Sequence, residues 1–339
     1  MNNAYPAGPV LVMGAGAIGC WLGGCLQAAD APVVFVGRPR VLAGLRSHGL
    51  TLTDLDGRHR HLPADTLSVH EAVPAGLAPA LVILAVKSGA TADAAALLAA
   101  ALPAGTPVVS MQNGLSNADT GRAAAPGLRW LAGMVPYNVA ELGPGHYHRG
   151  TTGQLAAQDD PALRALAAAF ERAGLSLQLH ADLRALQWGK LLLNLNNPVN
   201  ALSGRPLRAQ LMERGYRQCL VALQTEALGL LKGAGIAPAQ VGALPAHRVP
   251  RLLRLPTPLF KLIAARLLRI DPKARSSMAD DLAAGRVTEI DALCGEVVRL
   301  AAAQGRRAPL NARMVELVTT WPQQPVAMDA RALKAALGL

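Results

Sequence analysis

The chain has 339 residues, of which 51% are hydrophobic, 16% charged and only 3% aromatic. This composition excludes a disordered protein, and the length favours about two domains. The formal charge of +11 suits anionic partners, but no zinc-ligand spacing, aromatic RNA-binding run or lysine-rich tail accompanies it. We therefore expect a basic surface that attracts anionic small molecules, rather than a nucleic-acid-binding protein.

Cysteine usage and the N-terminal residues indicate the compartment. The four cysteines are scattered and form no Cys-x-x-Cys pair, which disfavours disulfides or a bound metal and favours a cytoplasmic protein. Residues 1–29 carry no charged side chain, but no basic residue precedes the apolar run and five glycines interrupt it. We therefore expect a buried strand and a glycine turn, not a signal peptide or a membrane span.

The first predicted strand, residues 10–13, leads into a glycine-rich turn and then a helical segment. The turn has the pattern GxGxxG and consists of Gly14, Ala15, Gly16, Ala17, Ile18 and Gly19. Gly14 permits the tight turn, Gly16 lets a pyrophosphate approach the backbone, and Gly19 allows the helix to pack closely on the strand. The pattern predicts dinucleotide binding at the helix N-terminus, although a glycine turn without a ligand is the alternative.

The end of the second predicted strand, within residues 32–40, indicates which dinucleotide binds. NAD requires a carboxylate there for the ribose hydroxyls, and no acidic residue occurs between Asp30 and Asp54. Arg38 follows this strand, and its guanidinium suits the 2′-phosphate of NADP(H). The sequence therefore favours NADP(H), with a solvated loop arginine as the alternative.

Two further apolar runs, residues 81–89 and 107–115, reach Lys87 and Asn113 near their ends. Ligands of doubly wound sheets collect beyond the carboxyl ends of the strands, although Asn113-Gly114 is equally typical of a tight turn. From about residue 183, helical patterns rich in alanine and leucine replace the strands. We predict an α/β protein with an N-terminal Rossmann-type doubly wound sheet (residues 1–182) followed by an all-helical C-terminal domain (residues 183–339).

The segment KLLLNLNNPVNALSG (residues 190–204) places polar side chains in an apolar helix. Lys190, Asn194 and Asn197 would share one helical face, and Pro198 should kink or end the helix. Unpaired buried amides are costly, so these side chains either satisfy one another or face a cavity that holds a polar ligand.

Residues 274–293 contain two apparent capping boxes, Ser277 with Asp280 and Thr288 with Asp291. Glu289 would then lie in the first turn of the second helix. Just before them, residues 246–275 hold nine basic or histidine residues and one acid. For this segment we favour a short amphipathic helix with a solvated basic face over a helix that lies on a membrane.

Taken together, these motifs resemble those of the ketopantoate reductase (2-dehydropantoate 2-reductase) family along essentially the whole chain. The markers are GAGAIG at 14–19, Gly37-Arg38, AVKS at 85–88, QNG at 112–114, WGKLLLN at 188–194, SSM at 276–278 and TEID at 288–291. The resemblance implies NADPH-dependent reduction of 2-dehydropantoate to (R)-pantoate, a step of pantothenate and coenzyme A synthesis. It also implies an NADP-binding domain over residues 1–182 and a substrate-binding and dimerisation domain over residues 183–339.

The resemblance also assigns roles by position. Lys190 resembles the proton donor, and Glu289 resembles a residue that orients it or holds the substrate hydroxyl. The implied substrate ligands are Asn194, Asn197, Ser277 and Asn113. The implied cofactor-side residues are the glycine turn, Arg38, Lys87, Asn113, Val139 and Glu289. No metal is implied, and the partners are a small keto acid and a second copy of the chain.

The sequence departs from the family pattern at Pro198, which stands where a second helix asparagine is expected. Asn197 takes that role only with a one-residue deletion, and residues 203–208 offer no clear match for a later asparagine. Two alternatives therefore stay open. One is a reductase of another branched keto acid with the same architecture, and the other is a non-catalytic NADP(H)-sensing protein.

Overall fold

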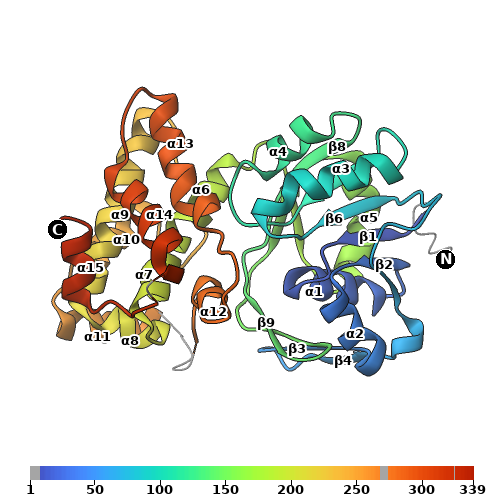
Figure 1. Cartoon of the computed structure of the whole chain (residues 1–339), viewed down its shortest axis with the longest axis horizontal. Coiled ribbons are helices and arrows are strands. Elements are labelled where there is room, and N and C mark those ends of the chain that lie inside the picture. The colour runs from blue at the N-terminus through green and yellow to red at the C-terminus, as the bar shows by residue number, and fades with distance from the viewer. Residues whose placement is uncertain (1–7, 268–273, 324) are drawn as a thin grey trace. The chain divides into compact units, whose positions relative to one another are not determined.

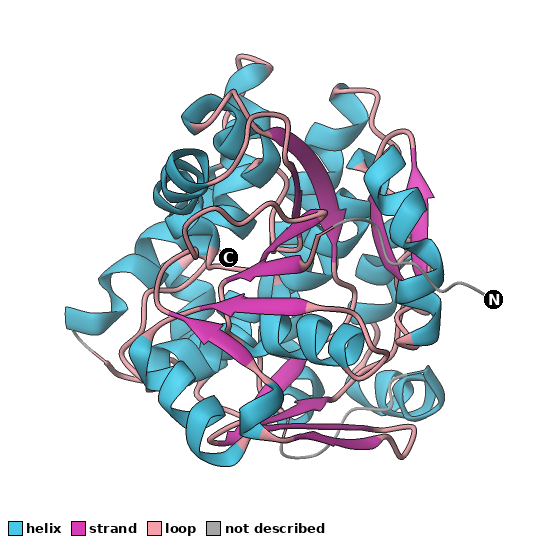
Figure 2. Ribbon diagram, turned by 90° about the vertical axis from the view of Figure 1, so that its right-hand side faces the viewer, coloured by secondary structure: helices cyan, strands magenta, loops and turns pink. Residues whose placement is uncertain are grey.

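The structure is a computed structural model that describes residues 8–267, 274–323 and 325–339 (Figure 1). The chain divides into two compact units, Met1–Leu183 and Arg184–Leu339. All strands of the described residues belong to the first unit. Figure 2 draws them as magenta arrows. No helix among the described residues is long and apolar enough to cross a membrane.

The first unit is built on an eight-stranded sheet with the order β12-β11-β8-β7-β6-β1-β2-β5. Its strands are β1 (Val10–Met13), β2 (Val33–Val36), β5 (Ser68–His70), β6 (Leu81–Leu84), β7 (Pro107–Ser110), β8 (Arg129–Met134), β11 (Leu155–Gln158) and β12 (Leu177–His180). The six neighbouring strands β5, β2, β1, β6, β7 and β8 run parallel to one another. By contrast, β11 pairs with β8 in the antiparallel sense. β1 lies between β2 and β6, so the strand order reverses beside β1, as in Rossmann folds.

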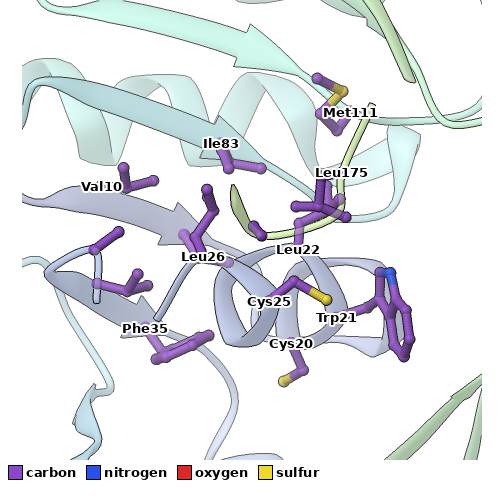
Figure 3. Close-up of a cluster of buried hydrophobic side chains, with 14 of the residues drawn as sticks. Val10, Cys20, Trp21, Leu22, Cys25, Leu26, Phe35, Ile83, Met111 and Leu175 are labelled. Carbon is purple, nitrogen blue, oxygen red and sulfur yellow. The ribbon is translucent and has the colours of Figure 1, made fainter. Parts of the chain in front are cut away.

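Helices cover both faces of this sheet, which explains why β1, β2, β6 and β7 are continuous apolar runs with every residue buried. On one face, Val10, Phe35 and Ile83 pack against residues of α1, including Leu22 and Leu26 (Figure 3). On the other face, alternate residues of the same strands pack against α3. The helices of this unit are α1 (Ala17–Gln27), α2 (Pro39–His48), α3 (Thr91–Ala101), α4 (Asn117–Ala124) and α5 (Pro161–Arg172), with 3-10 turns η1 (Ala64–Thr66) and η2 (Ser88–Ala90).

A second, four-stranded sheet in this unit has the order β4-β3-β10-β9. Its strands are β3 (Leu50–Asp54), β4 (His59–Leu62), β9 (Val139–Gly143) and β10 (His146–Arg149). This sheet was not among the predicted elements. Its inner face packs on α1 so closely that a Cβ on Gly24 would lie 2.6 Å from Cδ2 of Leu50. The sheet therefore braces the helix that follows the glycine turn.

The second unit is entirely helical in its described residues. Its helices are α6 (Arg184–Asn194), α7 (Asn196–Ser203), α8 (Leu207–Met212), α9 (Arg214–Gly233), α10 (Val249–Leu253), α11 (Thr257–Leu267), α12 (Ser277–Ala283), α13 (Glu296–Ala303), α14 (Pro309–Thr320) and α15 (Ala330–Ala336). A π-helical turn, η4 (Asp291–Gly295), precedes α13, and 3-10 turns occupy η3 (Ala246–Arg248) and η5 (Trp321–Gln323). The long helix α9 is the centre, and α7, α8, α10, α13, α14 and α15 pack around it. The predicted architecture, a Rossmann-type sheet followed by a helical domain, is confirmed.

The predicted helix in the basic segment 246–275 corresponds to η3, α10 and α11, while residues 268–273 of that segment lie outside the described residues. The predicted effect of Pro198 is also confirmed. The helix that begins at Arg184 breaks at Leu195, three residues before Pro198, and α7 continues from Asn196. Proline lacks the N–H that would bond to the carbonyl of Asn194, and its ring crowds that carbonyl.

Candidate functional site

The three glycines of the predicted dinucleotide turn have distinct surroundings. Gly14 has φ +106°, and a Cβ there would lie 2.6 Å from the backbone nitrogen of Val86. A Cβ on Gly19 would lie 2.1 Å from the carbonyl oxygen of Gly14 and 2.9 Å from Cγ1 of Val12, so α1 packs directly on β1. Gly16 differs, because a Cβ there would meet no atom within 4 Å. The turn therefore packs tightly on the protein at Gly14 and Gly19, whereas Gly16 faces open space.

The N-terminus of α1 at this opening carries no internal anion. Its N-cap residue is Gly16, no side chain caps the helix, and its first turn contains no acidic residue. The first N–H groups of a helix lack intrahelical acceptors and form the positive end of the helix dipole. A diphosphate group fits such an end, as it does in other glycine-turn dinucleotide sites. Ala15, Ala17 and Ile18 complete the turn, with Ala15 buried against Gly37.

Four neighbouring strands end side by side at this edge of the sheet. Their last residues are in register, since Met13 pairs with both Val36 and Leu84, and Leu84 pairs with Ser110. The segments that follow carry the glycine turn after β1, Arg38 after β2, Lys87 after β6 and Asn113 after β7. Lys87 and Asn113 are both partly buried. The structure thus brings these predicted residues to one edge of the sheet.

A buried polar network, which no sequence motif indicated, fixes the loop that contains Asn113. Nε2 of Gln112 donates to Oγ1 of Thr91 at 2.9 Å, and that hydroxyl donates to Oδ1 of Asn117 at 3.1 Å. The carbonyl oxygen of Asn113 accepts hydrogen bonds from Nδ2 of Asn117 at 2.6 Å and from Oγ of Ser88 at 2.9 Å. The loop after β6 and the loop after β7 are therefore linked through Asn113, which also turns the chain because the next residue, a glycine, has φ +92°.

The arginines after β2 have different partners. Arg40 forms a bidentate ion pair with Glu141 at 3.1 and 3.0 Å, and Arg46 donates to the carbonyl oxygen of Val69 at 3.3 Å. Arg38 is exposed at the start of α2, and its guanidinium has no hydrogen bond or ion pair with any described residue. Of these three arginines, Arg38 is therefore the one available to an external anion.

Val139 belongs to the small sheet of the first unit. It is the first residue of β9, pairs with Arg149 and is partly buried. β9 contacts α1, and Val139 packs against the same hydrophobic cluster as Ala17 and Ile18 of the glycine turn. The backbone contact predicted for Val139 stays a prediction.

In the second unit, Lys190 lies on α6 and is partly buried. The preceding Gly189 allows close packing, because a Cβ there would lie 2.2 Å from the carbonyl oxygen of Ala239. Burial lowers the pKa of the Lys190 ammonium to about 8, and the negative charge of Glu289 opposes this shift. The structure therefore brings Lys190 and Glu289 close enough to interact, although 99 residues separate them in the sequence.

The asparagines of residues 190–204 fall into two groups. Asn196 exchanges two hydrogen bonds with Gln210 at 3.2 and 3.3 Å. Asn200 donates to the carbonyl oxygen of Arg205 and accepts from the backbone N–H of Ser276, both at 2.9 Å. These two amides are thus satisfied inside the protein.

Asn194 and Asn197 form the other group. Both are partly buried, and their side chains make no hydrogen bond with any described residue. The carbonyl oxygen of Asn197 accepts a hydrogen bond from Oγ of Ser276 at 3.2 Å, and α7 packs against α12. The start of α12 therefore lies beside Asn197, with both amides left for another partner.

The predicted cap at Ser277 is wrong, because Ser276 caps α12. Ser276 has extended backbone angles, φ −75° and ψ 151°, and its Oγ accepts from the N–H of Ala279 at 3.2 Å. Ser277 is consequently the first helical residue, and it is exposed. Capping therefore does not account for Ser277, and its hydroxyl is accessible.

The predicted cap at Thr288 is also wrong. Helical structure begins at Ile290 with no side-chain cap, so Glu289 precedes the first turn instead of lying in it. The carboxylate of Asp291 binds Arg299 and does not take part in a capping box. The physical reason is the π turn, which changes the hydrogen-bond spacing at the helix start. Among the described residues no group of three or more His, Cys, Asp or Glu side chains is arranged to hold a metal.

Comparisons with known proteins agree with the predicted family. The family model described as ketopantoate reductase PanE/ApbA matches residues 10–161, and the model of its C-terminal part matches residues 182–321. A 2-dehydropantoate 2-reductase of Halobacterium salinarum is 28% identical over 91% of this chain and 97% of its own length. The crystal structure of a PanE/ApbA family ketopantoate reductase from Ralstonia eutropha has a TM-score of 0.78 and 28% identity, covering 93% of this chain and 99% of that one.

One further solved structure concerns the cofactor. A ternary complex of D-mandelate dehydrogenase with NADH and anilino(oxo)acetate has a TM-score of 0.73, covers 93% of this chain and 98% of its own, and is 19% identical. At that identity the likeness supports the fold alone. The two family models together span most of the sequence, in the order and positions expected from the motifs. The chain belongs to the ketopantoate reductase family of oxidoreductases.

Proposed function

We propose that the protein is an NADPH-dependent 2-dehydropantoate 2-reductase, which reduces ketopantoate to (R)-pantoate on the route to pantothenate and coenzyme A. The observation that carries this proposal is the Lys190 ammonium, partly buried on α6 and acted on by the charge of Glu289. A cationic donor of this kind is what reduction of a 2-keto acid requires, because negative charge develops on the C2 oxygen. Family membership supports the same reaction.

The first unit would bind NADPH. The open space at Gly16 and the uncapped N-terminus of α1 fit the diphosphate. Arg38, which has no ionic partner among the described residues, fits the 2′-phosphate. Lys87 and Asn113 follow neighbouring strands at the same sheet edge and would contact the cofactor, Asn113 also the substrate. NADPH supplies the hydride that adds to C2 of the keto acid.

Lys190 would stabilise and then protonate the C2 oxygen. Its pKa of about 8 keeps the amine charged at neutral pH, so the ammonium can bind the developing negative charge. The same lowered pKa makes loss of the proton easier than for an ordinary lysine, and a donor with a pKa near the working pH is the most effective. Glu289 would hold the ammonium in place or accept a hydrogen bond from the substrate hydroxyl.

The remaining groups would bind the substrate. The amides of Asn194 and Asn197 can both donate and accept hydrogen bonds, which suits a ligand with a hydroxyl and a carboxylate. Ser277, exposed at the start of α12, offers an O–H donor to the carboxylate. None of these three side chains has a hydrogen bond to a described residue.

The test is spectrophotometric NADPH oxidation with ketopantoate, with the product identified as pantoate by NMR. A panel of branched 2-keto and 3-keto acids in the same assay addresses substrate identity. Turnover of another keto acid in preference to ketopantoate would assign a different substrate to the same machinery. Tight NADPH binding without oxidation by any keto acid would support the non-catalytic alternative and contradict our proposal.

A further inference from the structure

The helix that follows Glu289 starts with an unusual turn. Asp291–Gly295 form a π turn, which runs directly into α13 (Figure 1). In a π turn each carbonyl bonds five residues ahead instead of four, which inserts one residue and rotates the preceding chain relative to the helix. Such turns are rare in proteins overall, but those that occur are frequently found at functional sites. Glu289 lies two residues before this turn, so the direction of its side chain depends on the turn being kept.

One arginine fastens the turn from within the same helix. Nη1 of Arg299 contacts both carboxylate oxygens of Asp291, at 3.0 and 2.9 Å, and Nη2 donates to the backbone carbonyl oxygen of Asp291 at 2.8 Å. Nε of Arg299 also donates to Oε2 of Glu296 at 3.3 Å, and Glu296 is buried. The guanidinium therefore joins the first residue of the π turn to the first turn of α13.

Gly295 makes room for this arrangement. A Cβ at Gly295 would lie 2.3 Å from Oδ1 of Asp291 and 2.9 Å from its Cγ. The carboxylate of Asp291 is thus folded over the glycine, where it meets Arg299. The opposite side of the same turn packs into the hydrophobic core, because its residues Ala292, Leu293 and Cys294 are buried.

We infer that Arg299 is a positioning residue, which holds the Glu289 carboxylate beside Lys190 by fastening the π turn through Asp291. This inference rests on the proposed function for its effect on turnover, although the placement of Glu289 can be measured without turnover. The ion pair itself is largely exposed, with 46% of the Arg299 side chain and 75% of the Asp291 side chain accessible. Exposed pairs contribute little to global stability, whereas the contact of Arg299 with the buried Glu296 can stabilise the fold. The placement of Glu289 is therefore measured separately from the melting temperature.

The test substitutes Arg299→Ala and follows the titration of Lys190 by NMR. The chain has only six lysines, so ¹³Cε-lysine labelling gives few signals, and Lys190→Arg identifies the one that matters. Loss of the positive charge of Arg299 alone can only raise the pKa of a nearby lysine. Displacement of Glu289 would lower the Lys190 pKa, because the negative charge of Glu289 raises this pKa and so opposes the effect of burial. We expect the Lys190 pKa to fall in Arg299→Ala and to recover partly in Arg299→Lys. The recovery is partial because a single ammonium cannot bind the carboxylate and the backbone carbonyl of Asp291 with the geometry of a guanidinium.

Arg313→Ala is the matched control. Arg313 forms an ion pair of similar exposure with Glu316 in α14, and its loss should leave the Lys190 titration unchanged. In turnover assays we expect kcat of Arg299→Ala to fall roughly 10- to 100-fold, as small misplacements of catalytic groups do, with NADPH affinity kept. A Lys190 titration that is the same in Arg299→Ala and Arg313→Ala would overturn the inference. If the parent protein reduces no keto acid, the proposed function fails, and the NMR result still decides the inference.

Discussion

At the scale of single residues, the most informative side chain is Lys190, because burial has changed its chemistry. We predict that Lys190→Ala lowers kcat by roughly 100- to 1,000-fold, the loss usual for one charge-stabilising donor of about 2.7–4 kcal/mol. NADPH affinity, measured by fluorescence titration, should stay the same, because the groups proposed to bind the diphosphate and the 2′-phosphate belong to the first unit. Lys232→Ala, at an exposed position on α9, is the control. Full turnover in Lys190→Ala would remove this residue from the chemistry.

The pH dependence of turnover follows from the same lysine. Because the proton donor must be charged, kcat/KM should fall as pH rises through the Lys190 pKa of about 8. The charge of Glu289 raises this pKa, so Glu289→Gln should move the alkaline limb of the profile to lower pH. The measurement is a pH–rate profile for both proteins. An alkaline limb near the ordinary lysine pKa in the parent protein would contradict the assignment.

Arg38 is the residue that we propose to distinguish between the two nicotinamide cofactors. We predict that Arg38→Asp weakens NADPH and improves NADH, because a carboxylate repels the 2′-phosphate and binds the ribose hydroxyls instead. The ratio of kcat/KM for the two cofactors measures the change. Arg40→Ala is the control, since Arg40 is already paired with Glu141. An unchanged ratio in Arg38→Asp would rule out contact with the 2′-phosphate.

At the scale of elements, Arg217 joins four helices of the second unit and has no carboxylate partner among the described residues. It is fully buried on α9 and donates to carbonyl oxygens of Leu211, Leu253 and Leu255 at 2.9 to 3.0 Å. Leu211 and Leu253 lie at the C-terminal ends of α8 and α10, where a cation is favoured, and Leu255 follows α10. The guanidinium also lies 4.3 Å from the ring of Phe260 in α11.

We predict that Arg217→Met lowers the free energy of unfolding by roughly 2–4 kcal/mol, because it leaves several buried carbonyls without donors. Arg217→Lys should be almost as unstable, since one ammonium cannot reach carbonyls on both helices. Calorimetry is the measurement, and Arg214→Met, at an exposed neighbouring position, is the control. A melting temperature equal to that of the control would show that the carbonyls are solvated without Arg217.

Some elements could be predicted from sequence and others could not, for identifiable reasons. The first strand was predicted at residues 10–13 and is found there, because an apolar run bounded by glycine is a local signal. The small sheet was missed because its strands carry histidine, threonine and charged residues instead of an apolar run, and β3 pairs with β10 about 95 residues away. The choice of Ser276 over Ser277 as cap depends on backbone angles that adjacent serines do not reveal.

The same distinction holds within the candidate site. The approach of Glu289 to Lys190 could be expected from family motifs but not from spacing. The network of Gln112, Thr91 and Asn117 behind Asn113 gave no separate signal, because each residue is ordinary alone. Which asparagine side chains lack a hydrogen bond to described residues likewise depends on tertiary contacts. Gln210 and Ser276 are the partners that satisfy Asn196 and Asn200.

At the scale of the whole molecule, cofactor binding should raise the free energy of unfolding. A ligand that binds only the folded state at 100 times its Kd stabilises it by about 2.7 kcal/mol. We predict that NADPH raises the melting temperature of the protein and that Gly16→Ala removes this rise. A methyl group at Gly16 meets no protein atom within 4 Å, so it would occupy the space proposed for the diphosphate. Without ligand, Gly16→Ala should cost less than about 1 kcal/mol, the usual difference between helix N-cap residues.

Gly19→Ala distinguishes this effect from damage to the fold. Its methyl group would lie 2.1 Å from the carbonyl oxygen of Gly14, so α1 must move away from β1. We therefore expect Gly19→Ala to melt at a lower temperature than the parent protein even without NADPH, unlike Gly16→Ala. The measurement is thermal unfolding of the three proteins with and without NADPH. If Gly16→Ala keeps the full stabilisation by NADPH, the open side of the glycine turn is not where the cofactor binds, and the diphosphate must lie on another part of the first unit.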